Sequence, residues 1–213
     1  MATHIDALQR HFEKPLLWAT IQFLNHGMLH DDLDLSVSQV GGGRNVLQAM
    51  AVMQRGDEVL HRTMAALGAR GDTPDQVFVA MPSVAGPRDC DVKADDIMAA
   101  PDNLLGQFER RTAHEDSANG CEYMWIRARR QTTIDAAYLA LVSDFFLGAH
   151  IKTRGGTSLD NTFRLINAHQ TEWILAVTQL SSFTRGAAQG TQHLFAEDGT
   201  LLSTSSQTGL LPR

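Results

Sequence analysis

Most of the chain alternates apolar and polar residues with a period of two, which is the pattern of strands that bury one face. The clearest run is 33–40, in which Leu35 and Val37 alternate with serines. The sequences Arg-Gly-Asp at 55–57 and Glu-Asp-Gly at 197–199 separate such runs and predict hairpins. The pattern predicts strands at 16–24, 33–40, 46–54, 58–67, 107–112, 122–130, 158–167, 172–180, 185–195 and 201–208.

Two segments depart from this pattern and predict helices. Residues 4–13 are short and amphipathic, whereas residues 133–151 are apolar on almost every side, as is typical of a buried helix. Asp135 lies close to the start of the second segment, where the helix dipole favours an acid. Gly148 marks its end. These helices and strands together predict an α+β fold with antiparallel sheets.

The order of these elements occurs twice. The sequence LSVSQV at 35–40 resembles LAVTQL at 175–180, an offset of 140 residues (175 − 35), and Phe23 and Phe163 are separated by the same offset. Each copy runs from a helix to a strand and then to a three-strand meander, which predicts two copies of one unit. We expect a truncated first unit at 1–73, a proline-containing linker at 74–103 and a second unit at 104–213.

Charge and composition narrow the class of partner. The formal net charge of −6 and the pI near 5.8 argue against nucleic acid as a partner. Arg127, Arg129 and Arg130 are candidates for a local contact with a phosphorylated group. Cys90 and Cys121 form no disulfide framework, and neither a signal peptide nor a membrane span is predicted, so we expect a cytoplasmic protein.

The residues alone suggest a small number of chemical groups. Asp144 lies in an apolar stretch, where lost solvation raises the pKa of a carboxyl group and favours a role as general base. His26 and His30 precede several acids, but Gly27 and the position between two strands predict an exposed loop instead of a metal site. We interpret His61 as a surface histidine.

Four stretches resemble one protein family: LVSDFFLG (141–148), TSLDNTFRL (157–165), EWILAV (172–177) and EDGTLLSTSSQTGLL (197–211). They are similar to the double-hotdog acyl-CoA thioesterases, including the bacterial type II enzymes. The resemblance implies a tandem hotdog fold, in which antiparallel sheets each wrap around a central helix. It also implies hydrolysis of acyl-CoA to a free acid and CoA, with no cofactor or metal, in a homodimer.

The family holds a water molecule with an Asp on the central helix, a Thr or Ser that opens the next strand and a Gln in the last strand. The resemblance places these three residues at Asp144, Ser158 and Gln207, with Thr157 as the alternative to Ser158 if the register shifts by one. It implies that Asp144 is the general base, while Ser158 and Gln207 position the water and the acyl carbonyl.

At the offset of 140 residues the first unit carries a different set, His4, Trp18 and Leu67. This set cannot repeat the polar trio, so we expect one site per chain. An alternative is a non-catalytic hotdog protein that binds an acyl thioester or assembles with a catalytic relative. A hydratase is less favoured, because no recognisable hydratase histidine motif is present.

Overall fold

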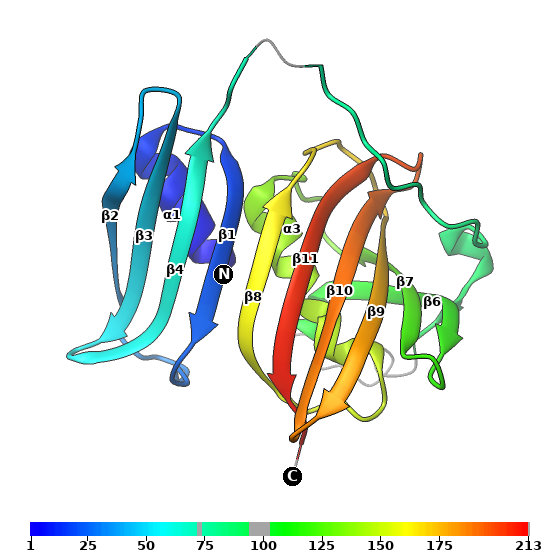
Figure 1. Ribbon diagram of the computed structural model, residues 1–213. Coiled ribbons are helices and arrows are strands. Elements are labelled where there is room, and N and C mark those ends of the chain that lie inside the picture. The colour runs from blue at the N-terminus through cyan, green and yellow to red at the C-terminus, as the bar shows by residue number, and fades with distance from the viewer. Residues whose placement is uncertain (72–73, 94–102, 213) are drawn as a thin grey trace.

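The computed structural model describes residues 1–71, 74–93 and 103–212. All strands in these residues belong to one antiparallel sheet with the order β2-β3-β4-β1-β8-β11-β10-β9-β7-β6-β5 (Figure 1). The strands are β1 (Leu16–Phe23), β2 (Asp34–Gly42), β3 (Val46–Arg55), β4 (Glu58–Gly68), β5 (Asp91–Val92), β6 (Phe108–Asp116), β7 (Cys121–Ala128), β8 (Thr157–Leu165), β9 (Ile174–Thr184), β10 (Ala187–Ala196) and β11 (Leu201–Leu210). Each strand predicted from the sequence is present. We call residues 1–71 the first half and residues 103–212 the second half.

The two halves share one continuous sheet, so the prediction of separate sheets is wrong. Strand β1 of the first half pairs with β8 of the second, with Thr20 opposite Thr162. The two threonine hydroxyl oxygens lie 2.8 Å apart and share a hydrogen bond. Each of these strands would otherwise leave an edge of unpaired backbone groups, and their pairing removes both edges.

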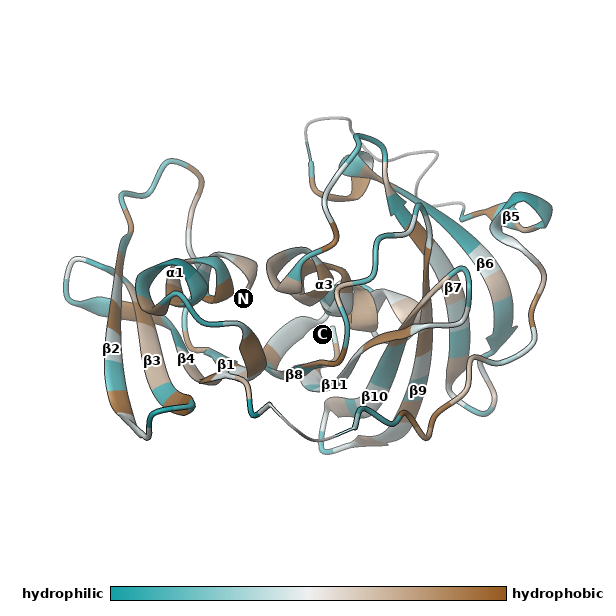
Figure 2. Ribbon diagram, turned by 90° about the horizontal axis from the view of Figure 1, so that it is seen from above, coloured by the Kyte–Doolittle hydropathy of each residue, from teal (hydrophilic) through white to brown (hydrophobic). Residues whose placement is uncertain are grey.

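Two helices lie on the same side of the sheet and pack against each other (Figure 2). They are α1 (Ala2–Phe12) and α3 (Ala136–Ser143). Asp135 is the N-cap of α3 and accepts a hydrogen bond from the Tyr138 amide at 2.8 Å. After Ser143 the predicted helix continues as the 3-10 helix η3 (Asp144–Ala149). None of the described helices has the length and hydropathy needed to cross a membrane.

The main core fills the space between the helices and the sheet. It includes Ile5 and Leu8 from α1, Leu139 and Val142 from α3, and Phe163 from β8. Because residues from both halves contribute, burial of apolar surface holds the halves together as well as the individual elements.

A smaller core lies on the outer face of the sheet, around Trp125 and Trp173. The described residues 74–90, which lead into β5, cross this face (Figure 1). Met81 and Val84 pack on the cluster, and the Trp125 indole donates to the Ala85 carbonyl at 2.9 Å. The described part of the predicted linker thus takes part in the fold, and it also contains η1 (Pro87–Asp89) and β5.

Candidate active site

The three residues expected to hold a water molecule come together at the junction of a helix and two strands. Asp144 begins η3, Ser158 is the second residue of β8, and Gln207 lies in β11. The Gln207 side-chain amide donates to Asp144 Oδ1 at 3.1 Å and to Ser158 Oγ at 2.7 Å. One side chain therefore connects the carboxylate to the hydroxyl.

A β-bulge turns Ser158 toward Gln207. Asn161 lies opposite Gln207, and both are buried beneath the helix. Ser158 is an odd number of residues before Asn161, so regular alternation would turn it to the outer face. The register shift between Thr208 and Gly209 pairs Ser158 with Gly209 and restores the inward direction.

Two further contacts fix this geometry. The Thr208 amide donates to Asp160 Oδ1 at 2.8 Å, so the Asp160 carboxylate helps to hold the bulge. Gly209 lets η3 come close to β11, because a Cβ at this position would lie 2.6 Å from a methyl carbon of Leu147. The close approach places Asp144 within hydrogen-bond reach of Gln207.

Gln207 connects the other two residues and has little left to offer a ligand. Its side chain is 3% exposed, and the two hydrogen bonds use both hydrogens of its amide. Its carbonyl oxygen Oε1 is buried without a hydrogen-bond partner among the described residues. Ser158 Oγ accepts from Gln207, so the serine proton remains available to donate.

Asp144 combines access to solvent with a poorly solvated setting. The residue is exposed along a pocket wall, yet protein atoms surround its carboxylate on most sides. Burial raises the pKa of Asp144 above its ordinary value, and the Met1 amino group and the Gln207 hydrogen bond offset this only in part. Among the described residues Oδ2 has no hydrogen-bond partner, so this oxygen can accept a proton from a water molecule.

Asp144 borders two pockets of different character. The first, of about 250 Å³, has a wall of apolar side chains, and we call it the apolar pocket: Leu104, Leu105, Leu141, Phe145 and Leu147. The second, of about 500 Å³, lies between the two halves, and we call it the polar pocket: Phe23, Asn25, His26, His61 and Ser158. The carboxylate of Asp144 is common to both.

The structure also bears on two other residues named from the sequence, Thr157 and His61. Thr157 is exposed and pairs with Leu210, so it is Ser158 that contacts Gln207. His61, expected at the surface, is half-buried and lines the polar pocket. Its ring lies against the Phe23 ring, with 5.3 Å between the two ring centroids. Alternation on β4 carries no sign of this role, because the pocket forms only when β4 and β8 are brought together.

The structure also changes which residues of the first half correspond to Ser158 and Gln207. Both halves carry a β-bulge between two strand pairs. In the first half it lies between the pairs Leu16–Leu67 and Trp18–Ala66. In the second half it lies between Ser158–Gly209 and Asp160–Thr208, at an offset of 142 residues (158 − 16). The offset of 140 is therefore wrong for these strands. Ser158 corresponds to Leu16 instead of Trp18, and Gln207 corresponds to Ala65 instead of Leu67. Both counterparts are still apolar.

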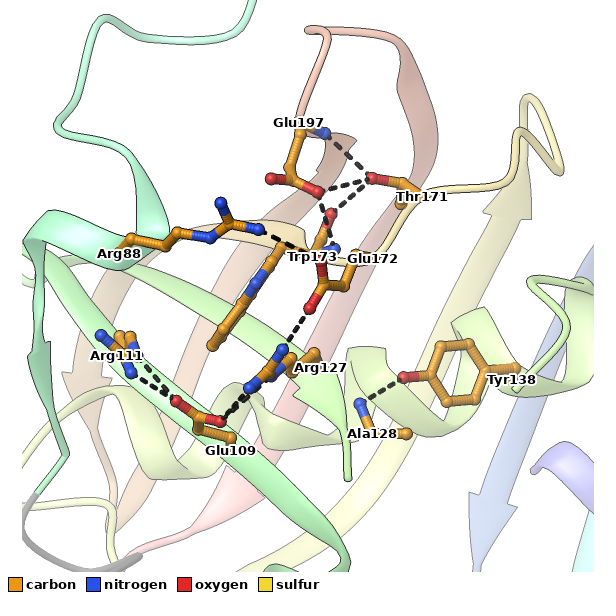
Figure 3. Close-up of polar contacts among 10 residues, drawn as sticks. All are labelled: Arg88, Glu109, Arg111, Arg127, Ala128, Tyr138, Thr171, Glu172, Trp173 and Glu197. Atoms are coloured by element: carbon orange, nitrogen blue, oxygen red, sulfur yellow. Dashed lines mark hydrogen bonds and ion pairs between the residues drawn. The ribbon is translucent and has the colours of Figure 1, made fainter. Parts of the chain in front are cut away.

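A third pocket, of about 680 Å³, is lined by Arg127, Arg129 and Arg130, and we call it the arginine pocket. Arg127 is already engaged, as Figure 3 shows, because it pairs with Glu109 and Glu172 and lies 4.5 Å over the Trp173 ring. Tyr138 of α3 lines this pocket, whereas Asp144, beyond the other end of α3, does not.

Glu109 lies between Arg111 and Arg127 in this cluster (Figure 3). Burial alone would raise the pKa of Glu109, but the hydrogen bonds and charges of the two arginines outweigh burial and lower it. The cluster is thus an internally neutralised network. No group of His, Cys, Asp or Glu side chains in the described residues could hold a metal ion.

The antiparallel sheet packed against a central helix is the architecture of a hotdog-fold protein. The model of the acyl-CoA thioesterase C-terminal domain family matches residues 87–211, and the chain belongs to this family. A comparison with curated proteins finds no match for this chain.

Solved structures with similar folds agree with this assignment. A candidate thioesterase from Novosphingobium aromaticivorans has a TM-score of 0.90 and 27% identity, over 100% of this chain and 86% of that chain. An acyl-CoA thioesterase II from Mycobacterium marinum has a TM-score of 0.83 and 18% identity, over 99% and 86% of the two chains. A hotdog-fold protein of unknown function from Alicyclobacillus acidocaldarius has a TM-score of 0.85 and 20% identity, over 100% and 85%. The latter two establish the fold alone.

Proposed function

We propose that the protein is an acyl-CoA thioesterase, which hydrolyses an acyl-CoA to a free acid and CoA with a water molecule held by the trio of Asp144, Ser158 and Gln207, in which Gln207 acts by positioning the other two. The observation that carries this proposal is the pair of hydrogen bonds from the Gln207 amide, at 3.1 Å to Asp144 and 2.7 Å to Ser158. They support it because they join a carboxylate and a hydroxyl group beside two pockets large enough to admit a substrate.

The chemistry assigns a separate task to each residue. Asp144 Oδ2 takes a proton from the water, whose oxygen attacks the thioester carbonyl carbon. Ser158 donates a hydrogen bond to the water or to the carbonyl oxygen, and Gln207 keeps both partners in place. The C–S bond of the resulting tetrahedral intermediate breaks, and the CoA thiolate that leaves accepts the proton that Asp144 took from the water.

The deciding experiment follows thiol release from a set of acyl-CoAs with the purified protein. Thiol release at a rate proportional to protein concentration supports the thioesterase. Binding of acyl-CoA without release from any member of the set would instead establish the non-catalytic hotdog protein. The matched activity control is the Asp144→Asn variant, which keeps the shape of the side chain and removes the base.

We also propose that the chain is a tandem hotdog with a shortened first unit, with boundaries at 1–73, 74–103 and 104–213. The corresponding bulges support a repeat, because they are separated by 142 residues (158 − 16). The paired residues Thr20 and Thr162 are separated by the same 142 residues, so the two units meet at equivalent positions.

We further propose a homodimer that acts in the cytoplasm on lipid-derived acyl-CoAs. Hotdog proteins commonly pair through their sheets, and most soluble oligomers are symmetric. Cys90 and Cys121 are free thiols, as fits a reducing compartment. Light scattering at micromolar concentration tests the dimer, and the mass of a single chain would contradict it.

A further inference from the structure

The two pockets that meet at Asp144 differ in polarity, and so do the two arms of an acyl thioester. The apolar pocket is lined mainly by leucines and Phe145, whereas the polar pocket offers His26, His61 and Asn25. An acyl-CoA carries an apolar chain on one side of the reacting carbonyl and an amide-rich pantetheine arm on the other. A carbonyl held beside Asp144 can therefore direct each arm into the pocket that matches it.

We infer that the acyl chain occupies the apolar pocket and the pantetheine arm occupies the polar pocket, so that the preferred substrates carry an uncharged acyl group of up to about eight carbons. The inference rests on the proposed function. It also gives the first half, which lacks the trio, a role in binding the substrate, because Phe23, His26 and His61 line the polar pocket.

The length limit follows from the volume of the apolar pocket. A methylene group takes about as much space as a water molecule, which occupies about 30 Å³ in the liquid. The pocket volume of about 250 Å³ thus accepts about eight such groups. A longer chain would leave its end in water and lose the apolar burial that favours binding.

The charge limit follows from the groups that border the pocket. Most of its wall is apolar, so a charged acyl group would lose its hydration on entering without a matching gain. Arg110 and Arg154 also border the pocket, but both guanidinium groups are engaged. Arg110 lies 5.4 Å over the Phe145 ring, and Arg154 Nε donates to the Gly148 carbonyl at 3.4 Å.

Leu141 is the residue that should set the chain-length limit. It lies three residues before Asp144, on the same face of the helical segment, and it is half-buried at the pocket wall. A larger side chain here takes space from the pocket without touching the trio. Leu159, which lines the polar pocket and is 39% exposed, is the matched control.

The test measures kcat/KM for acyl-CoAs of two to sixteen carbons and for a charged acyl-CoA such as glutaryl-CoA. In the wild type we expect kcat/KM to increase up to about eight carbons and to fall at least tenfold beyond that length. Leu141→Phe should shift the optimum to shorter chains, while Leu159→Ala should leave the preferred length unchanged. Equal rates for eight and sixteen carbons, or a preference for glutaryl-CoA over hexanoyl-CoA, would overturn the inference.

A second arm separates this inference from the proposed function. Non-hydrolysable thioether analogues of the same chain lengths are titrated against the wild type and both variants. If no thiol is released but affinity follows the same length limit and shifts in Leu141→Phe, the proposed function fails and the pocket assignment stands. If thiol is released but affinity is independent of chain length, the proposed function stands and the pocket assignment fails.

Discussion

Both halves pack a sheet against a helix, but the second half buries many more polar side chains beneath its helix. In the first half the inner face of the sheet is alanine and leucine, as at Ala19, Leu47, Ala49, Ala51 and Ala65. In the second half the inner face buries apolar side chains such as Phe163 and also polar ones, including Asn161, Thr178, Gln192, Ser205 and Gln207. Within residues 1–71 the buried polar side chains are His4 and Thr63.

We attribute this difference to the proposed site in the second half. A buried polar atom without a partner costs about 1–3 kcal/mol, and the second half contains several, including Asn161 Oδ1, Gln192 Oε1 and Gln207 Oε1. Such groups persist where function requires them. The alanine-rich first half instead packs closely and supplies one wall of the polar pocket.

The largest expected effect comes from removing the residue that connects the trio. Gln207→Ala should lower kcat/KM for thioester hydrolysis by about 10²- to 10³-fold, because Asp144 and Ser158 lose their common donor. Thiol release measures the effect. Gln48→Ala, at an exposed position in the first half, is the matched control and should keep the wild-type rate. Equal loss in both variants would contradict the assignment of chemistry to the second half.

The second prediction concerns pH and the first half. Burial lowers the pKa of His4 to about 3, and its Nδ1 shares a 2.8 Å hydrogen bond with the Thr63 hydroxyl. The unfolded chain takes up a proton near pH 6.5 that the folded chain refuses, so stability falls as pH decreases from 6.5 toward 3. The slope of this contribution is about 1.4 kcal/mol per pH unit.

Urea unfolding between pH 7 and pH 4 measures this slope. His4→Gln should lose the His4 part of the pH dependence, whereas His30→Gln, at an exposed position with a free side chain in the described residues, should keep it. Equal pH dependence in wild type and His4→Gln would show that the buried histidine does not govern the acid stability of the first half.

A smaller effect should follow from loosening the bulge that turns Ser158 inward. Asp160→Ala removes the acceptor of the Thr208 amide and should lower kcat about tenfold with little change in KM, because Ser158 is displaced while the pockets remain. Asp160→Asn keeps an acceptor oxygen and should restore most of the rate. Failure of Asp160→Asn to exceed Asp160→Ala would argue against this positioning role.

The sequence allowed the strands and the meeting of the three side chains of the proposed site to be predicted, for different reasons. Alternation on β2 and the hairpin turns are local signals, and they were sufficient for each main strand. Asp144, Ser158 and Gln207 came from the family resemblance in flanking stretches. The pairing of Thr20 with Thr162 and the bulge at Ser158 could not be predicted, because they depend on contacts between strands distant in the sequence and on a register shift of one residue.

Asp144→Asn tests the central claim most directly, with kcat/KM for an acyl-CoA measured against pH and with the melting temperature of each protein. The Asp144 carboxylate must be ionised to act as a base, and burial raises its pKa. Wild-type activity should therefore fall as the pH decreases, and the midpoint of this fall should lie above the ordinary pKa of an aspartate. Because burial disfavours the ionised form of Asp144 in the folded state, the Asp144→Asn variant should keep or raise the melting temperature. Its rate of hydrolysis should drop about 10²- to 10⁴-fold. A folded Asp144→Asn variant that hydrolyses acyl-CoA at the wild-type rate would contradict the account.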